Sequence, residues 1–195
     1  MGAIESFVVR AKHWQVFFLL FGLFFVGNAV AVRAMINNPA DLFRSLLPVF
    51  VFTELLGLCF ALWLWCLGLF LNSLLDASRR KRLAFFRFAI IYPPLYMLVF
   101  MAVFQNMSTT PGLFLMIFPL HLWAMFCLLY DFYFVSKSLA LVESGRPVSF
   151  ADYAGYFIGV WVFPVGVWII QPRINRLYAS GFSGEKCIDP SLRSG

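Results

Sequence analysis

The chain has 195 residues, of which 62% are hydrophobic and 12% are charged, whereas a soluble domain has about 45–50% and about 25%. A soluble core of this length cannot bury so much apolar surface, so we expect an all-α integral membrane protein. The net charge is +6, but the basic residues stand at the ends of apolar runs rather than on a basic surface domain. We therefore expect membrane lipid as a partner and no nucleic acid.

Four apolar runs are long enough to cross a hydrocarbon core about 30 Å thick at about 1.5 Å per residue. They cover residues 14–33, 46–75, 83–105 and 111–142. The first run is longer than the roughly 7–15 residues of a signal-peptide core, so we expect it to remain as a span. These runs predict four transmembrane helices.

The last apolar stretch, residues 150–170, can be a fifth span or a hairpin. The basic cluster Arg79–Arg82 predicts a cytoplasmic loop between the second and third spans. A hairpin turning at Phe163–Gly166 keeps 13 of the 15 basic residues on that same side, whereas a fifth span does not. We therefore expect a re-entrant or interfacial helical hairpin over 150–170, with a kinked fifth span as the alternative.

This topology places both termini in the cytoplasm. Residues 1–178 then form a single transmembrane domain. Residues 179–195 are polar and rich in glycine and serine, which predicts a flexible cytoplasmic tail.

Three polar side chains stand out in the outer half of the predicted spans, where such groups are costly and usually have a role. Glu54 and His121 each lie about 12–15 Å below the outer face, counting about 1.5 Å per residue. Asn28 lies a little more than one turn from the outer end of the first span. We expect Asn28, Glu54 and His121 to meet as an intramembrane polar cluster. It is either a proton or cation relay or a hydrogen-bonded lock between three helices.

Arg87 and Asp131 form a second candidate near the inner face. Arg87 lies one turn into the third span, and Asp131 lies near the cytoplasmic end of the fourth. Because these spans are antiparallel neighbours, we expect an ion pair between the two residues. Its role is structural, since both side chains can reach toward the interface.

Most other chemistry lacks its usual residue pattern. The four cysteines, Cys59, Cys66, Cys127 and Cys187, include no C-x-x-C pair, so we expect neither a metal site nor a disulfide framework. The two histidines lie at different depths, which disfavours haem held by both. The catalytic motifs G-x-S-x-G and H-E-x-x-H do not occur. We expect no cofactor and no catalytic residues.

The segment FPVGVWIIQPRIN, from Phe163 to Asn175, resembles a motif of small multi-pass bacterial membrane proteins with no assigned function. The resemblance covers roughly the last third of the chain before the tail. It implies a bacterial inner membrane and no activity. Physically, the segment places polar groups at headgroup level, next to tryptophans that favour the interface. Five residues are expected to contact lipid or a partner protein: Trp161, Trp168, Gln171, Arg173 and Asn175.

The leading functional hypothesis is a non-enzymatic accessory or scaffold subunit of a larger membrane protein complex, bound to other membrane proteins or to copies of itself. The 25 phenylalanines offer flat apolar surfaces for such contacts. One alternative is a small ion, proton or solute transport component that uses Glu54 and His121. A second alternative is an intramembrane lipid-modifying enzyme.

Overall fold

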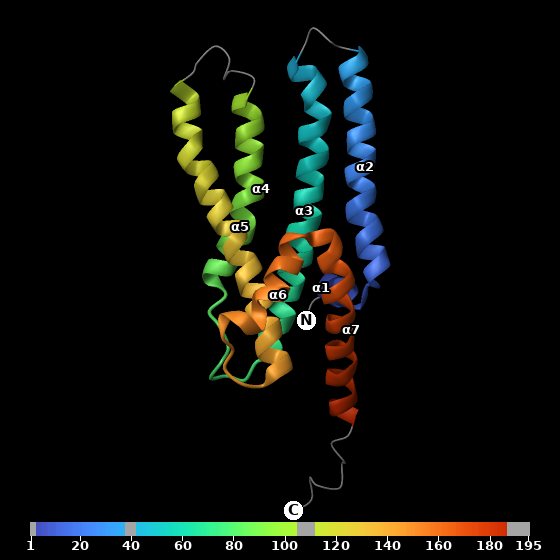
Figure 1. Cartoon of the computed structure of the whole chain (residues 1–195), viewed down its shortest axis with the longest axis vertical. Helices are drawn as coiled ribbons and strands as arrows, with labels where there is room; N and C mark the ends of the chain where they lie inside the picture. The colour runs from blue at the N-terminus through green and yellow to red at the C-terminus, as the bar shows by residue number, and fades with distance from the viewer. Residues whose placement is uncertain (1–2, 38–41, 105–111, 187–195) are drawn as a thin grey trace, which may run out of the picture.

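The computed structural model describes residues 3–37, 42–104 and 112–186, and within these ranges the chain forms helices and no strand (Figure 1). The helices are α1 (Ala3–Arg10), α2 (His13–Asn37), α3 (Leu42–Leu74), α4 (Ala84–Phe104), α5 (Gly112–Ser144), α6 (Phe150–Trp161) and α7 (Phe163–Lys186). The predicted all-α class is confirmed.

Four helices are long and apolar enough to cross a membrane: His13–Asn37, Leu46–Leu74, Ala84–Phe104 and Leu115–Ser144. Each coincides with one predicted span to within a few residues. The helices α3 and α5 have 33 residues each, more than the roughly 20 that a bilayer requires, so they tilt or extend beyond the hydrocarbon core.

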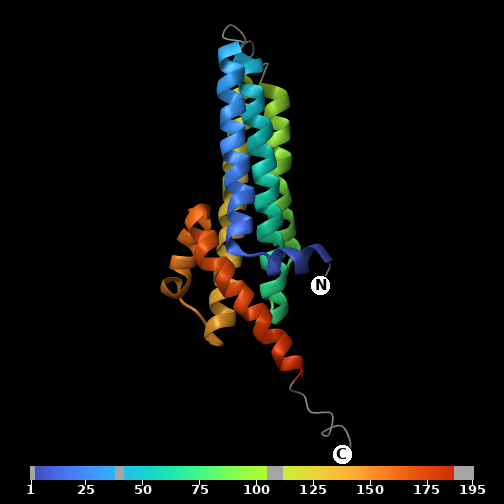
Figure 2. The same ribbon diagram turned by 90° about the vertical axis from the view of Figure 1, so that its right-hand side faces the viewer.

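The spans form two antiparallel pairs, α2 with α3 and α4 with α5, and α3 contacts both helices of the second pair (Figure 1). The short helix α1 and the helices α6 and α7 gather around one end of these pairs (Figure 2). We call this the basal end, and we call the end where α2 stops and α3 begins the distal end. The helix α1 was not among the predicted elements.

Side-chain packing is concentrated at the basal end. One core cluster joins α1, α2, α3, α4, α5, α6 and α7 there, and it includes the fully buried Leu67, Phe86, Phe134 and Ile170. A second, smaller cluster joins only α4 and α5, and its buried members are Tyr96, Ile117 and Ala124. The basal end therefore has the common core of all seven helices.

The helices α6 and α7 meet at Val162 and pack closely because two glycines face each other. A Cβ atom built on Gly166 would lie 1.8 Å from the Gly159 carbonyl oxygen, whereas one on Gly159 would lie 3.7 Å from the Gly166 Cα. The close contact between the helices therefore requires glycine at position 166, whereas position 159 has room for a side chain. The ring of Phe163, next to the turn, lies 6.2 Å from that of Phe21 and 5.5 Å from that of Phe60.

The helix α7, the second of these two helices, is longer than the sequence predicted. The helix α7 runs on past residue 178, where we expected the tail to begin, and ends at Lys186. Ile170, Ile174 and Leu177 face the core at helical spacing. This apolar face favours continuation of the helix beyond the predicted boundary. The tail prediction was thus wrong for 179–186, and 187–195 lies outside the described residues.

Candidate functional site

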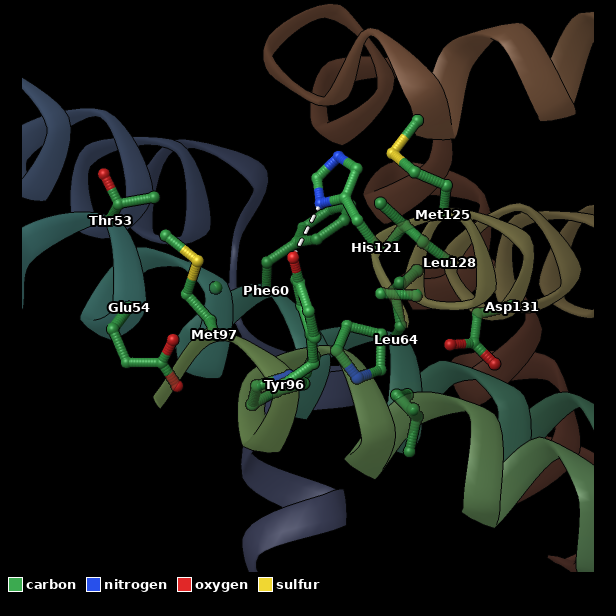
Figure 3. A pocket seen from close by; sticks show the side chains of 16 residues that line it. Thr53, Glu54, Phe60, Leu64, Tyr96, Met97, His121, Met125, Leu128 and Asp131 are labelled. Atoms are coloured by element: carbon green, nitrogen blue, oxygen red, sulfur yellow. Dashed lines mark hydrogen bonds between the residues drawn. The ribbon is translucent and has the colours of Figure 1, made fainter. Parts of the chain in front are cut away.

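A pocket of about 290 Å³ lies between α3, α4 and α5 (Figure 3). Its walls are mostly apolar, with Phe60, Leu64 and Leu128 among them. Five of the 16 lining residues carry polar side-chain atoms: Thr53, Glu54, Tyr96, His121 and Asp131. Glu54, His121 and Asp131 were predicted from the sequence as site residues, but Asp131 was expected at a different site.

Glu54 is 8% exposed, and its Oε1 atom is buried without a hydrogen-bond partner among the described residues. Asp131 is 1% exposed, and both of its carboxyl oxygens are likewise buried and unpartnered. The two acids lie on opposite sides of the pocket, with Tyr96 between them (Figure 3). Unpaired buried carboxyl groups are costly, so these three oxygen atoms are the most unusual feature of the site.

His121 pairs with Tyr96 instead of Glu54. The Tyr96 hydroxyl and the His121 Nδ1 atom are 3.1 Å apart, and this contact joins α4 to α5 (Figure 3). No hydrogen bond joins Glu54 to His121 in the part of the chain that the structure describes. Tyr96 was missed by the sequence analysis, because a tyrosine in an apolar run does not signal a partner by itself.

Asn28 lies apart from this pocket, so the predicted three-residue cluster was wrong. Its side-chain amide donates a 2.7 Å hydrogen bond to the Phe24 carbonyl on its own helix. It lines a separate pocket of about 100 Å³ between α2 and α3, beside Gly27 and Phe52. The face of α3 that carries Glu54 points to α4 and α5, and this separates the two residues although their depths agree.

The predicted ion pair between Arg87 and Asp131 does not form. Arg87 is exposed, while both Asp131 oxygens are buried and have no partner within the described residues. The neighbouring Phe86 is fully buried on α4 and stacks on Phe134 at 4.3 Å. Because one residue turns a helix by about 100°, the buried position of Phe86 directs Arg87 away from the core.

Gln171 belongs to the basal core, so its predicted contact with lipid or a partner was wrong. The residue is fully buried. Its Oε1 atom accepts a 2.9 Å hydrogen bond from the Trp63 indole, and its Nε2 atom donates to the Val8 and Ala11 carbonyls at 3.1 and 2.9 Å. Asn175 donates to the same Ala11 carbonyl at 3.3 Å. Together these amides donate to carbonyl groups at and just beyond the C-terminal end of α1, where a helix lacks donors of its own.

Arg173 joins the three helices α5, α6 and α7 at the basal surface. Its guanidinium lies 3.1 Å from the Glu143 carboxylate and donates a 2.6 Å hydrogen bond to the Tyr156 hydroxyl. Tyr156 in turn donates to Glu143 at 2.5 Å. Partial burial, followed by the hydrogen bond to Glu143, raises the pKa of Tyr156. The hydrogen bond with Glu143 likewise raises the pKa of Arg173.

The two tryptophans beside the turn differ in their surroundings. Trp161 is 63% exposed. Trp168 is partly covered, since its ring packs against His13 at 4.6 Å and Phe17 at 5.5 Å. This tryptophan therefore helps to fasten α7 to the start of α2.

Lys81 is a partly buried basic residue that was predicted only as part of a topology signal. Its backbone N–H donates to the Asn72 side chain at 2.9 Å, and its ammonium donates to Ser138 at 3.3 Å. The ammonium also lies 4.8 Å above the Phe134 ring. Burial, and secondarily the charge of Lys137, lowers the pKa of Lys81 to about 8.

Among the residues that the structure describes, no group of three or more histidine, cysteine or acidic side chains is placed to hold a metal ion. The candidate site is therefore the pocket between α3, α4 and α5. No protein-family model, curated protein or solved structure matches this chain.

Proposed function

We propose that this chain is a non-enzymatic subunit of a larger membrane protein assembly and that α3 packs against a transmembrane helix of its partner. The observation that carries the proposal is an exposed apolar stripe on α3. The stripe consists of Val51, Leu55, Leu58 and Leu62, which are 42–46% exposed. Their spacing of four, three and four residues places them on one helix face, as in the seam between two packed helices.

Along the described side chains of α3, the stripe is a face that its own bundle leaves open toward the distal end. Phe52 and Leu56 face α2, and Glu54 and Ala61 face the pocket beside α4 and α5. At the basal end α1 reaches the foot of the stripe near Leu62. The open face therefore begins where α1 ends and continues toward the distal end.

The small extent of internal packing favours a protein neighbour on this stripe. Within its most apolar stretch, 11% of the residues of α3 are buried, although this helix contacts α1, α2, α4 and α5. Lipid chains are as apolar as leucine, so helices associate in membranes mainly through close packing and hydrogen bonds. A partner helix along the stripe would supply packing that the distal end lacks.

Site-specific photo-crosslinking tests this proposal. A photo-reactive phenylalanine analogue is placed at Leu55 or Leu58 on the stripe, or at Leu19 or Val26 on the exposed surface of α2 as matched controls. We expect one discrete protein adduct from the two α3 positions, mapped to a transmembrane helix of another protein, and none from the α2 positions. Adducts with lipid alone, at all four positions, would refute the proposal.

The same proposal includes a topology. The basal end faces the cytoplasm, α6 and α7 form a re-entrant hairpin, and the membrane is the bacterial inner membrane that the FPVGVWIIQPRIN resemblance implies. The ring contacts of Phe163 with Phe21 and Phe60 support the hairpin, because both partners lie inside spans. A cysteine at Arg176 tests it: labelling from the cytoplasmic side is expected, and labelling only from the outside would require five spans.

A transport component is the second candidate, and the unpartnered oxygens of Glu54 and Asp131 favour it. It receives less support, because the pocket is mostly apolar and Glu54 is not bonded to His121. Proton or cation flux into liposomes tests this candidate. Flux that survives both Glu54→Gln and His121→Ala would remove these residues from any transport role.

A further inference from the structure

We propose that the pocket between α3, α4 and α5 binds an amphiphilic organic cation, meaning an apolar body that carries a protonated amine. This site is separate from the exposed stripe on α3 and does not depend on the partner proposed above. Its lining residues come from all three of these helices (Figure 3). Three properties of the pocket carry the inference: its unpaired acids, its excess of acceptors and its apolar walls.

The first property is the pair of carboxyl groups without partners. Glu54 and Asp131 are each more than nine-tenths buried and line the same pocket. An ionised carboxylate in such surroundings costs several kcal/mol unless a positive group pairs with it. The basic side chain predicted to pair with Asp131, Arg87, is exposed. A cationic ligand in the pocket supplies the missing counter-charge.

The second property is an excess of hydrogen-bond acceptors on the pocket walls. Pro93 and Pro94 lie inside α4 and line the pocket. Because proline has no N–H, the carbonyl of Ile90, which also lines the pocket, loses its usual helical donor at Pro94. The Tyr96–His121 contact uses one of the two donors that these side chains carry, and the histidine tautomer decides which one remains. An N–H donor from a ligand therefore fits this wall better than another acceptor does.

The third property is the apolar remainder of the lining. Phe60, Leu64 and Leu128 provide a surface for a hydrocarbon body, and aromatic faces such as that of Phe60 also attract a nearby cation. Met97 and Met125 are flexible side chains that adapt to ligands of varied shape. The volume of about 290 Å³ is near the lower limit of about 300 Å³ for small-molecule pockets, so the ligand is small.

Carbodiimide labelling of the intact chain in phosphatidylcholine nanodiscs tests the site. Dicyclohexylcarbodiimide is apolar and modifies carboxyl groups that it reaches within the membrane, and peptide mapping identifies the modified residue. We expect labelling at Glu54, Asp131 or both. N,N-dimethylhexylamine, a tertiary amine that is protonated at neutral pH, should slow this labelling roughly tenfold, which corresponds to about 1.4 kcal/mol of binding. Hexanol and hexyl sulfate at equal concentration should not slow it.

Two glycines provide matched variants. A Cβ atom at Gly57 in the pocket, or at Gly22 on α2, would meet no atom within 4 Å. Gly57→Leu fills the pocket and should abolish protection by the amine, whereas Gly22→Leu should retain it. Melting temperatures of both variants check that they are folded.

Three results would overturn the proposal. Equal protection by hexanol would show that the pocket holds only hydrocarbon chains. Protection that persists in Gly57→Leu would place the amine elsewhere, and an absence of labelling at both acids would show that the carboxyl groups are not accessible. None of these results bears on the crosslinking of α3, so the two proposals fail separately.

Discussion

The basal and distal ends of this protein are built from the same four spans, yet they are held together differently. At the basal end, helices distant in sequence are joined by buried hydrogen bonds, such as those from Gln171 to Trp63 and to α1. At the distal end, the described contacts between helices are mostly ring against ring, such as Phe50 with Phe104 at 4.9 Å. The polar contact Tyr96–His121 lies between these regions and joins only α4 and α5.

This difference has a physical basis. Apolar contacts between helices gain little over contacts with lipid, whereas an unpaired polar group in the membrane costs several kcal/mol. The polar network therefore fixes the basal arrangement, and the distal helices remain available for other neighbours. Four variants test this difference between the two ends.

The largest effect is expected for Gly166→Ala. The added methyl group would overlap the Gly159 carbonyl oxygen at 1.8 Å, and a backbone atom cannot move aside as a flexible side chain does. We expect the free energy of unfolding to fall by at least the roughly 1–3 kcal/mol typical of overpacking. The melting temperature in detergent should fall accordingly. Gly159→Ala is the control, since its methyl group has room at 3.7 Å. Equal losses in the two variants would contradict the close packing of α6 on α7.

The next effect is expected for Gln171→Leu. It removes the acceptor of the Trp63 indole and one donor each from the Val8 and Ala11 carbonyls, and a buried unsatisfied group costs about 1–3 kcal/mol. We expect α1 to detach, which increases thiol labelling of a cysteine at Val9, a fully buried position. Asn28→Leu is the distal control, because that amide bonds only its own helix. Unchanged labelling in Gln171→Leu would show that α1 is held by other contacts.

A smaller, pH-dependent effect is expected at Lys81, whose pKa burial and Lys137 lower to about 8. The pKa of an unfolded lysine is about 10.4. Between these two values the unfolded chain binds more protons than the folded chain, so the stability contribution of Lys81 increases as the pH rises from 8 toward about 10.4.

Lys81→Met should therefore be more stable than the wild type at pH 7, and the gap in melting temperature should narrow by pH 10. Lys12→Met, at an exposed lysine, serves as the control and should follow the wild type throughout. Parallel curves for Lys81→Met and the wild type would show that the lysine is fully charged in the folded protein over this range.

The smallest effect is expected for Arg173→Gln. The guanidinium is 42% exposed, and exposed ion pairs contribute about 0–1 kcal/mol. We expect a small fall in melting temperature at low salt, and a smaller difference between variant and wild type in 1 M salt because the Debye length falls to about 3 Å. A salt-independent loss of several degrees would instead show that Glu143, Tyr156 and Arg173 act as a buried network.

The sequence predicts the parts of this fold that depend on composition along one segment. The four spans follow from apolar runs, and the turn between α6 and α7 follows from the Phe163–Gly166 segment. The helix α1 was missed, because eight residues with an acid and a base do not resemble a span and are held by Gln171 from the far end of the chain. A contact between residues 163 positions apart leaves no local signal.

The candidate site was predicted in part. Depth along the spans correctly grouped Glu54 with His121 on one pocket, but depth carries no information about which way a side chain points. Asn28 and Arg87 were misplaced for that reason, since each points away from the residue it was expected to meet. The buried position of Phe86 shows the orientation of α4 only after the helices are packed.

The bond network of Gln171 also has a consequence for how the protein is made. Val8 and Trp63 are synthesised 163 and 108 residues before Gln171, so α1 cannot reach its final position until Gln171 has been made. During translation α1 and the indole of Trp63 remain without this partner. A change near Val8 and a change near Gln171 would then disturb the same late step of biogenesis, although these residues are 163 positions apart.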